Sequence, residues 1–206
     1  LIPDPAKCHL IPFNTTPLEK ELALRLGIPM YGADPKFMGF GTKSGCRRMF
    51  ADEGVPHPLG EEGLMSLADA SAAIARMRVT RPSMQQVLIK LNDGVSGAGN
   101  ALVDLAGLPA PGEAAEAAAL AERVANLKLE AEWRTREDYI GALEKDGGVV
   151  EERITGDEFR SPSVQLRVTP LGAVEILSSH DQLLGGPGGM SFLGSMFPAD
   201  PGYAAA

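Results

Sequence analysis

One stretch decides the fold that we expect for this chain: residues 87–100, which read VLIKLNDGVSGAGN. Its apolar, β-branched start predicts a buried strand over Gln86–Leu91, and Ala101–Leu105 is expected to form the partner strand. The connecting loop contains three glycines and a serine. Glycine lets backbone N–H groups point into one cavity, where they can hold phosphate oxygens, and a lysine supplies a point charge for the same phosphates. The stretch therefore indicates a phosphate-binding hairpin with Lys90 at the end of its first strand.

Two familiar phosphate-binding motifs do not match this loop. It is not a P-loop, because no Gly-Lys-Ser/Thr closes the glycine run. It is not the dinucleotide fingerprint, because the spacing Gly94-x-x-Gly97-x-Gly99 is reversed and no helix is expected to follow. The alternative is an ordinary hairpin with a mobile glycine tip, in which Lys90 is a solvated charge. Support for a nucleotide site must come from elsewhere in the chain.

That support lies about 60 residues later, in residues 149–159, which read VVEERITGDEF. Two acidic residues stand at the end of an apolar strand, and a third follows a turn. The backbone of an edge strand can hydrogen-bond a flat heterocycle, and a carboxylate beyond it can accept both hydroxyls of a ribose. Taken alone, an exposed acidic strand end is the simpler interpretation. Together, the lysine–glycine loop and this acidic hinge are the parts that a nucleotide site requires.

Composition limits the function classes. The chain has 206 residues, is 44% hydrophobic and carries a net charge of −8, which is typical of a soluble globular protein. The net negative charge argues against nucleic-acid binding and against adhesion to anionic membranes. No apolar run approaches the ~20 residues of a membrane span. Cys8 and Cys46 lack the spacing of a zinc site or a disulfide framework, so we expect reduced thiols and a cytoplasmic location.

The rest of the chain predicts an α+β fold with mostly antiparallel strands. Residues 28–42, rich in glycine and proline, are expected to form a linker. Trp133 and the methionines are expected in the core. Helices are expected over 17–26, 44–53, 113–126 and 135–143 and after Ser66, and further strands over 127–133, 149–154, 163–168 and 173–178.

The order of these motifs resembles that of the ATP-grasp ligases. Residues 43–56 resemble the family's first lysine helix, which ends in a Gly-Val-Pro turn. Residues 90–99 resemble the second lysine and its flexible glycine loop, and residues 151–158 resemble the adenine hinge and the ribose acid. Three further sequence segments resemble the pheganomycin-type amino-acid ligases: IPFNTT at 11–16, RSPSVQ at 160–165 and HDQ at 180–182.

The resemblance implies a set of ATP-binding residues: Lys43, Lys90, Ser96, Gly97, Ala98, Gly99, Glu151, Glu152, Ile154 and Glu158. The two lysines would contact the α- and β-phosphates, and the backbone of the glycine loop would close over the β- and γ-phosphates. The hinge would bind adenine through the Glu151 side chain and the backbone of Glu152 and Ile154, and Glu158 would bind the ribose. Arg160 either orients a substrate carboxylate or acyl phosphate, or is a surface strand residue.

The implied activity is ATP-dependent ligation of a small carboxylate to an amine, such as an amino acid or peptide, through an acyl phosphate. The implied cofactors are ATP and Mg²⁺. The family's Glu-x-Asn metal motif is absent from this sequence. We therefore expect an ATP-grasp fold, two α+β subdomains holding ATP between them, that is incomplete at both ends. Residues 1–40 would end a preceding domain, 41–126 would form the first subdomain and 127–206 would begin the second.

Two rival functions remain open. One is a nucleotide-binding module without catalysis, and the other is an ATP-grasp phosphotransferase that needs no amine. A second glycine cluster at 185–189 is also open to two interpretations. It lies either near an acceptor substrate or in a simple connection between strands, with His180 as a capped or solvent-facing side chain.

Overall fold

The computed structural model describes residues 2–203, and the chain divides into two compact units between His57 and Pro58. The first unit contains α1 (Pro17–Leu26), α2 (Lys43–Asp52) and two short 3₁₀ helices, Pro5–Lys7 and Pro35–Gly41. The second 3₁₀ helix lies within the expected linker. Helix α1 begins and ends as its sequence predicts: Thr16 and Glu19 form a capping box, and Gly27 ends the helix at a φ of 64°.

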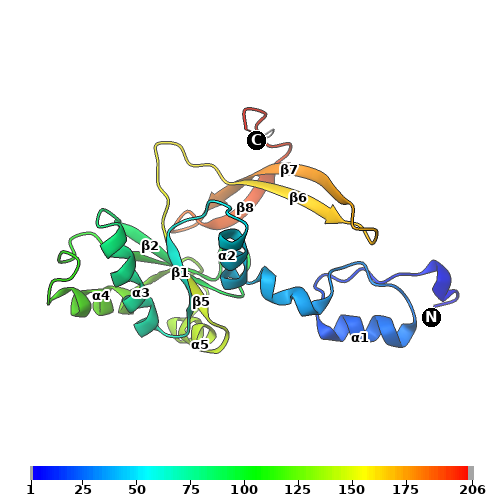
Figure 1. Ribbon diagram of the computed structural model, residues 1–206, viewed down its shortest axis with the longest axis horizontal. Coiled ribbons are helices and arrows are strands. Elements are labelled where there is room, and N and C mark those ends of the chain that lie inside the picture. The colour runs from blue at the N-terminus through cyan, green and yellow to red at the C-terminus, as the bar shows by residue number, and fades with distance from the viewer. Residues whose placement is uncertain (1, 204–206) are drawn as a thin grey trace. The chain divides into compact units, whose positions relative to one another are not determined.

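The larger unit is built on an antiparallel five-stranded sheet in the order β1-β5-β2-β3-β4. Its strands are β1 (Gly60–Leu64), β2 (Gln86–Leu91), β3 (Asn100–Asp104), β4 (Lys128–Leu129) and β5 (Gly148–Glu152). Its helices are α3 (Leu67–Thr80), α4 (Glu116–Ala125) and α5 (Arg136–Asp146). Figure 1 shows this sheet with α3, α4 and α5 beside it. Helices α3 and α4 pack against each other and against this sheet.

The core lies between the sheet and the helices because side chains alternate along β2. Val87, Ile89 and Leu91 are buried in one cluster with Ile74 of α3. The strand pairs with β3 on one side and with β5 on the other, so it is central in the sheet. The opposite face of β2 carries Leu88 and Lys90, which do not belong to this core cluster.

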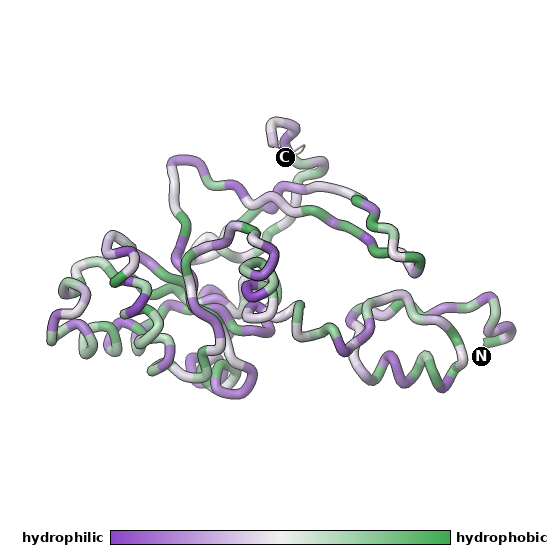
Figure 2. The backbone as a smooth tube through the Cα atoms, in the orientation of Figure 1, coloured by the Kyte–Doolittle hydropathy of each residue, from purple (hydrophilic) through white to green (hydrophobic). Residues whose placement is uncertain are grey.

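A second sheet contains three antiparallel strands in the order β6-β7-β8. They are β6 (Pro162–Val168), β7 (Val174–Gly185) and β8 (Ser191–Met196). Hydrophobic residues recur along these strands, as the colours of the backbone tube in Figure 2 show. Several of them are exposed, among them Val164, Ile176 and Leu193. The turn over residues 186–190 connects β7 to β8, so the second glycine cluster lies in a strand connection.

Several expected elements differ in extent. The alternating stretch 127–133 forms only the two-residue β4, and Trp133 is 75% exposed rather than in the core. The alternation fails because Glu130, expected on the polar face, turns inward and is 3% exposed. Of the methionines, Met77 and Met84 are in the core, whereas others such as Met196 are exposed.

Two strands, β1 and β8, were not expected from the sequence. Strand β7 is also longer than expected, because it continues past residue 178 to Gly185. Strand β1 reads GEEGL and has no apolar alternation; it forms against the edge of β5. Within residues 2–203, none of the helices has the length and apolar content needed to cross a membrane. Cys8 and Cys46 are both free thiols.

Candidate functional site

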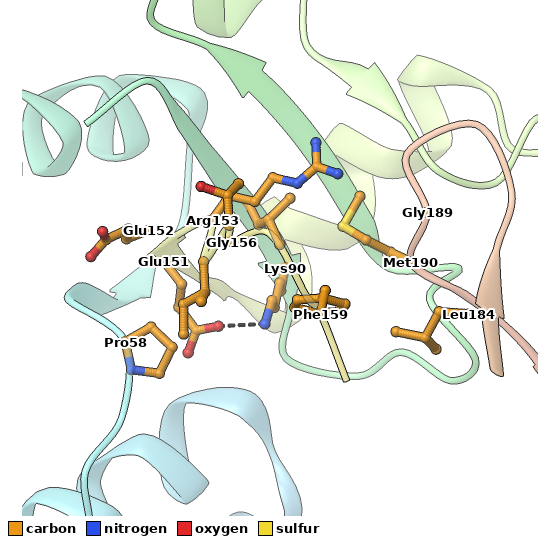
Figure 3. Close-up of a pocket in the computed structure, with 13 residues that line it drawn as sticks. Pro58, Lys90, Glu151, Glu152, Arg153, Gly156, Phe159, Leu184, Gly189 and Met190 are labelled. Atoms are coloured by element: carbon orange, nitrogen blue, oxygen red, sulfur yellow. Dashed lines mark ion pairs between the residues drawn. The ribbon is translucent and has the colours of Figure 1, made fainter. Parts of the chain in front are cut away.

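A pocket of about 460 Å³ opens in the larger unit on the face of β2 that carries Leu88 and Lys90 (Figure 3). The sheet supplies its floor, the chain after β5 supplies one wall, and β7 with the β7–β8 turn supplies another. The lining residues are Pro58, Leu88, Lys90, Glu151, Glu152, Arg153, Ile154, Thr155, Gly156, Phe159, Leu184, Gly189 and Met190. The pocket therefore combines apolar side chains with three kinds of charged group: an ammonium, carboxylates and a guanidinium.

An ion pair between Lys90 and Glu151 lies at the floor of the pocket (Figure 3). In the register of β2 and β5, Leu88 lies opposite Glu151 and Lys90 lies opposite Val149. Lys90 and Glu151 are therefore diagonal neighbours on the same face of the sheet. Their side chains are 25% and 10% exposed. The pair offers a ligand one cationic donor and one anionic acceptor at partly buried positions.

The acidic hinge forms the wall beside this pair. Strand β5 ends at Glu152, whose N–H donates to the Leu59 carbonyl at 2.8 Å. The N–H of Arg153 donates to the Gln86 carbonyl at 3.1 Å, which is the last backbone contact of this segment with β2. Ile154 then leaves the sheet, is 57% exposed and lines the pocket. The hinge backbone beyond β5 is thus open on the pocket side.

The glycine loop between β2 and β3 is folded back on itself. The Leu91 N–H donates to the Gly99 carbonyl at 2.9 Å, and the Ala98 N–H donates to the Val95 carbonyl at 2.9 Å. Ser96 and Gly97 have φ values of 54° and 86°. A Cβ on Gly97 would lie 2.4 Å from the carbonyl oxygen of Met190, so the loop packs directly on the β7–β8 turn. The loop therefore lies next to a wall of the pocket without lining it.

Besides the glycine loop, three further expected site residues lie outside the pocket lining. Lys43 is the first residue of α2 in the smaller unit, after the cap residue Thr42. Glu158 is 71% exposed and forms an ion pair with Arg160 at 2.6 Å. Arg160 also contacts the Asp200 carboxylate at 2.6 Å. Hydrogen bonds to the Glu158 and Asp200 carboxylates raise the pKa of Arg160 above its ordinary value. The sequence-based roles of these residues stay predictions.

Two residues of this region, Arg153 and Glu130, were not predicted from the sequence to belong to the site. Arg153 lines the pocket and donates to the Gln86 side chain and to the Gly188 carbonyl, each at 2.9 Å. Glu130 is buried and accepts hydrogen bonds from the backbone of the β7–β8 turn. Both contact residues far away in the chain, so no local pattern could have revealed them.

Comparison with known protein families shows which family the chain matches. A family model described as "IQCH-like, ATP-grasp" matches residues 37–116 and 113–201. The chain belongs to this family. A curated relative, IQ motif-containing protein H of Danio rerio, is 28% identical over 207 residues. The match covers 86% of this chain and 19% of the relative, so the IQCH-like chain spans about a fifth of that protein's length.

A solved structure shows the same fold. D-alanyl-alanine synthetase A from Vibrio cholerae O1 biovar eltor matches with a TM-score of 0.53 and 11% identity, over 87% of this chain and 46% of that one. The expected α+β, ATP-grasp fold class and the resemblance to the superfamily are therefore confirmed. The narrower resemblance to pheganomycin-type ligases finds no support in these comparisons. The matching family is the IQCH-like one.

The ATP-grasp superfamily implies a magnesium ion, which takes carboxylate oxygens among its ligands. Across residues 2–203, no group of three or more His, Cys, Asp or Glu residues could hold a metal ion. The described residues therefore do not fit a metal centre by themselves.

Proposed function

We propose that the pocket over β2 and β5 binds ATP. The observation that carries this proposal is that Lys90, Glu151 and Ile154, from motifs about 60 residues apart, line the same pocket. The volume of about 460 Å³ lies within the usual range for small-molecule sites. Apolar walls suit the faces of a purine, and the lysine suits a phosphate. The ATP-grasp fold supports the same assignment.

The proposed roles follow from the positions of the groups. Lys90 would exchange its pairing with Glu151 for a phosphate oxygen, because an ammonium binds either anion. The Glu151 carboxylate would then accept from the amino group of adenine, with the hinge backbone at Glu152 and Ile154 completing the base site. The loop Ser96–Gly99 would cover the terminal phosphates. Lys43 and Glu158 are proposed to complete the phosphate and ribose contacts.

We further propose that the whole protein is a cytoplasmic carboxylate–amine ligase. A small carboxylate would attack the γ-phosphorus of ATP, which gives an acyl phosphate and ADP. An amine, such as that of an amino acid or peptide, would then attack the acyl carbon and release phosphate and a proton. The protein would act by positioning and by stabilising charge. In this proposal residues 41–126 and 127–206 belong to the two subdomains that hold ATP, and residues 1–40 end a preceding domain.

Nucleotide titration of the 206-residue chain tests the binding step. We expect Lys90→Met to weaken ATP binding by about tenfold or more, because a charge-assisted contact to phosphate is lost. Lys145→Met is the matched control, because Lys145 is an exposed lysine of the same unit. The absence of ATP binding by the unmodified chain, or equal affinities for the two variants, would refute the proposal.

Product analysis of the whole protein separates ligation from its rivals. A ligase releases phosphate and forms an amide only when both the carboxylate and the amine are present. ADP formation that needs no amine identifies a phosphotransferase. ATP binding without turnover identifies a binding module.

A further inference from the structure

A single buried carboxylate holds the β7–β8 turn. Glu130 is 3% exposed and directs both carboxylate oxygens at this turn. Its Oε2 accepts the Gly188 N–H at 2.8 Å. Its Oε1 accepts the N–H groups of Met190 at 3.1 Å and Ser191 at 2.9 Å, and the Ser191 hydroxyl at 2.9 Å. Four donors from one short segment therefore converge on one side chain.

Two glycines lie where the backbone closely surrounds this carboxylate. A Cβ on Gly186 would lie 2.5 Å from Glu130 Oε1, and a Cβ on Gly188 would lie 2.3 Å from Oε2. Gly186 also has a φ of 83°, which favours glycine. The second glycine cluster thus forms a backbone anion site that the chain fills with its own carboxylate. The N–H groups that an external phosphate would need here are already bound.

The same turn forms a wall of the pocket. Gly189 and Met190 line the pocket beside Leu184, across from Pro58 and Glu151 in Figure 3. Arg153 binds the turn from the pocket side, through the Gly188 carbonyl at 2.9 Å. The turn is therefore fixed by an acid and a base, and its position sets the place of the Met190 side chain.

We propose that Glu130 is a positioning residue of the nucleotide pocket. By binding the backbone of residues 188–191, its carboxylate holds Gly189 and Met190 as the apolar wall that contacts the purine base. This inference rests on the proposed ATP-binding function. It predicts that loss of the carboxylate weakens binding of the base more than binding of the phosphate chain, because Lys90 contacts the phosphates and does not depend on the turn.

The test compares Glu130→Gln with Glu132→Gln in the 206-residue chain. Both changes turn a carboxylate into an amide, but Glu132 is exposed. In Glu130→Gln an amide NH₂ replaces an acceptor, so we expect hydrogen exchange at the backbone amides of Gly188, Met190 and Ser191 to become about tenfold faster. Adenosine should bind about tenfold more weakly. Inorganic tripolyphosphate should lose clearly less affinity than adenosine, whereas a general loss of structure would weaken both probes equally.

Two results for Glu130→Gln would overturn the positioning role: unchanged hydrogen exchange at the turn, or unchanged affinity for adenosine. The proposed ATP-binding function would still stand if the unmodified chain binds the nucleotide. Equal weakening of adenosine and tripolyphosphate overturns it as well. If the unmodified chain binds neither probe, both the function and the positioning role fail.

If Glu130→Gln does not fold, two glycine-to-alanine variants test the same proposal. Gly188→Ala places a methyl group 2.3 Å from the carboxylate and should displace the turn, whereas Gly194→Ala in β8 meets no atom within 4 Å. We expect only Gly188→Ala to weaken adenosine binding. Equal adenosine affinities for the two variants overturn the proposal.

Discussion

At the scale of single residues, pairing decides what each charge can do. Lys90 and Glu151 neutralise each other at the pocket floor, which makes their partial burial tolerable. Arg160, by contrast, is engaged by the Glu158 and Asp200 carboxylates. A substrate carboxylate would have to displace one of them before Arg160 could orient it. Lys90 is better placed than Arg160 to bind a ligand, because the ion pair of Lys90 with Glu151 lies within a pocket.

Tyr139 gives a prediction about pH at the same scale. Its ring is fully buried, and its hydroxyl donates to the Ile89 carbonyl at 2.9 Å. Burial raises the pKa of Tyr139 well above its usual value of 10.0. The unfolded chain therefore releases this proton first, and the free energy of unfolding should fall as the pH rises above about 10. Urea unfolding between about pH 9 and pH 11 should show this fall, with a smaller slope in Tyr139→Phe.

The control is Tyr31→Phe, because Tyr31 is half exposed. It should leave the alkaline slope of the parent chain intact. At neutral pH, Tyr139→Phe should cost about 1–2 kcal/mol, since the Ile89 carbonyl loses a buried partner. Equal slopes for the parent chain and Tyr139→Phe would contradict the explanation.

At the scale of elements, the glycine loop depends on a close approach to the β7–β8 turn. Gly97→Ala adds a Cβ 2.4 Å from the Met190 carbonyl at a φ of 86°. Gly107→Ala has a similar φ of 73° but meets no atom within 4 Å, so it isolates the backbone strain. We expect a destabilisation of about 1 kcal/mol for Gly107→Ala and about 2 kcal/mol more for Gly97→Ala. Urea unfolding measures both.

Nucleotide affinity extends this comparison. Because the turn also supplies Met190 to the pocket wall, Gly97→Ala should weaken ATP binding and Gly107→Ala should not. If the two alanine variants have the same stability and the same affinity, the contact between the loop and the turn is not important for either.

The elements also show what the sequence could and could not predict. Strand β2 and helix α1 follow from local periodicity and capping, so both were predicted almost to the residue. Strand β1 has no such pattern and forms because β5 offers it an edge. Trp133 was expected in the core because of its residue type, but the alternation of residues 127–133 ends at the buried Glu130 and Trp133 is exposed. The partners of that carboxylate lie about 60 residues away, at a distance where local patterns carry no information.

The candidate site divides in the same way. The lysine, the glycine loop and the hinge are contiguous motifs, so their chemistry could be predicted from the sequence. The wall formed by Leu184, Gly189 and Met190 could not, because it depends on how the second sheet meets the first within the larger unit. Arg153 belongs to both groups: it stands in the hinge motif, but its partner Gly188 does not.

At the scale of the whole molecule, all 13 residues that line the pocket belong to the unit that begins at Pro58. This unit contains both sheets and the main core cluster. We therefore expect a chain of residues 58–206 to fold and to bind adenosine with the affinity of the 206-residue chain. Lys43 is absent from this shorter chain, so ATP, which carries the phosphates, should bind it more weakly if Lys43 has its proposed role.

Calorimetric titration of both chains with adenosine and with ATP makes this comparison, with circular dichroism as the check on folding. Lys43→Met in the 206-residue chain should reproduce the loss of ATP affinity and leave adenosine binding intact. A folded 58–206 chain that binds no adenosine would show that the base site needs residues of the smaller unit. Equal ATP affinities for the two chains would instead remove Lys43 from the phosphate site, while leaving Lys90 in place.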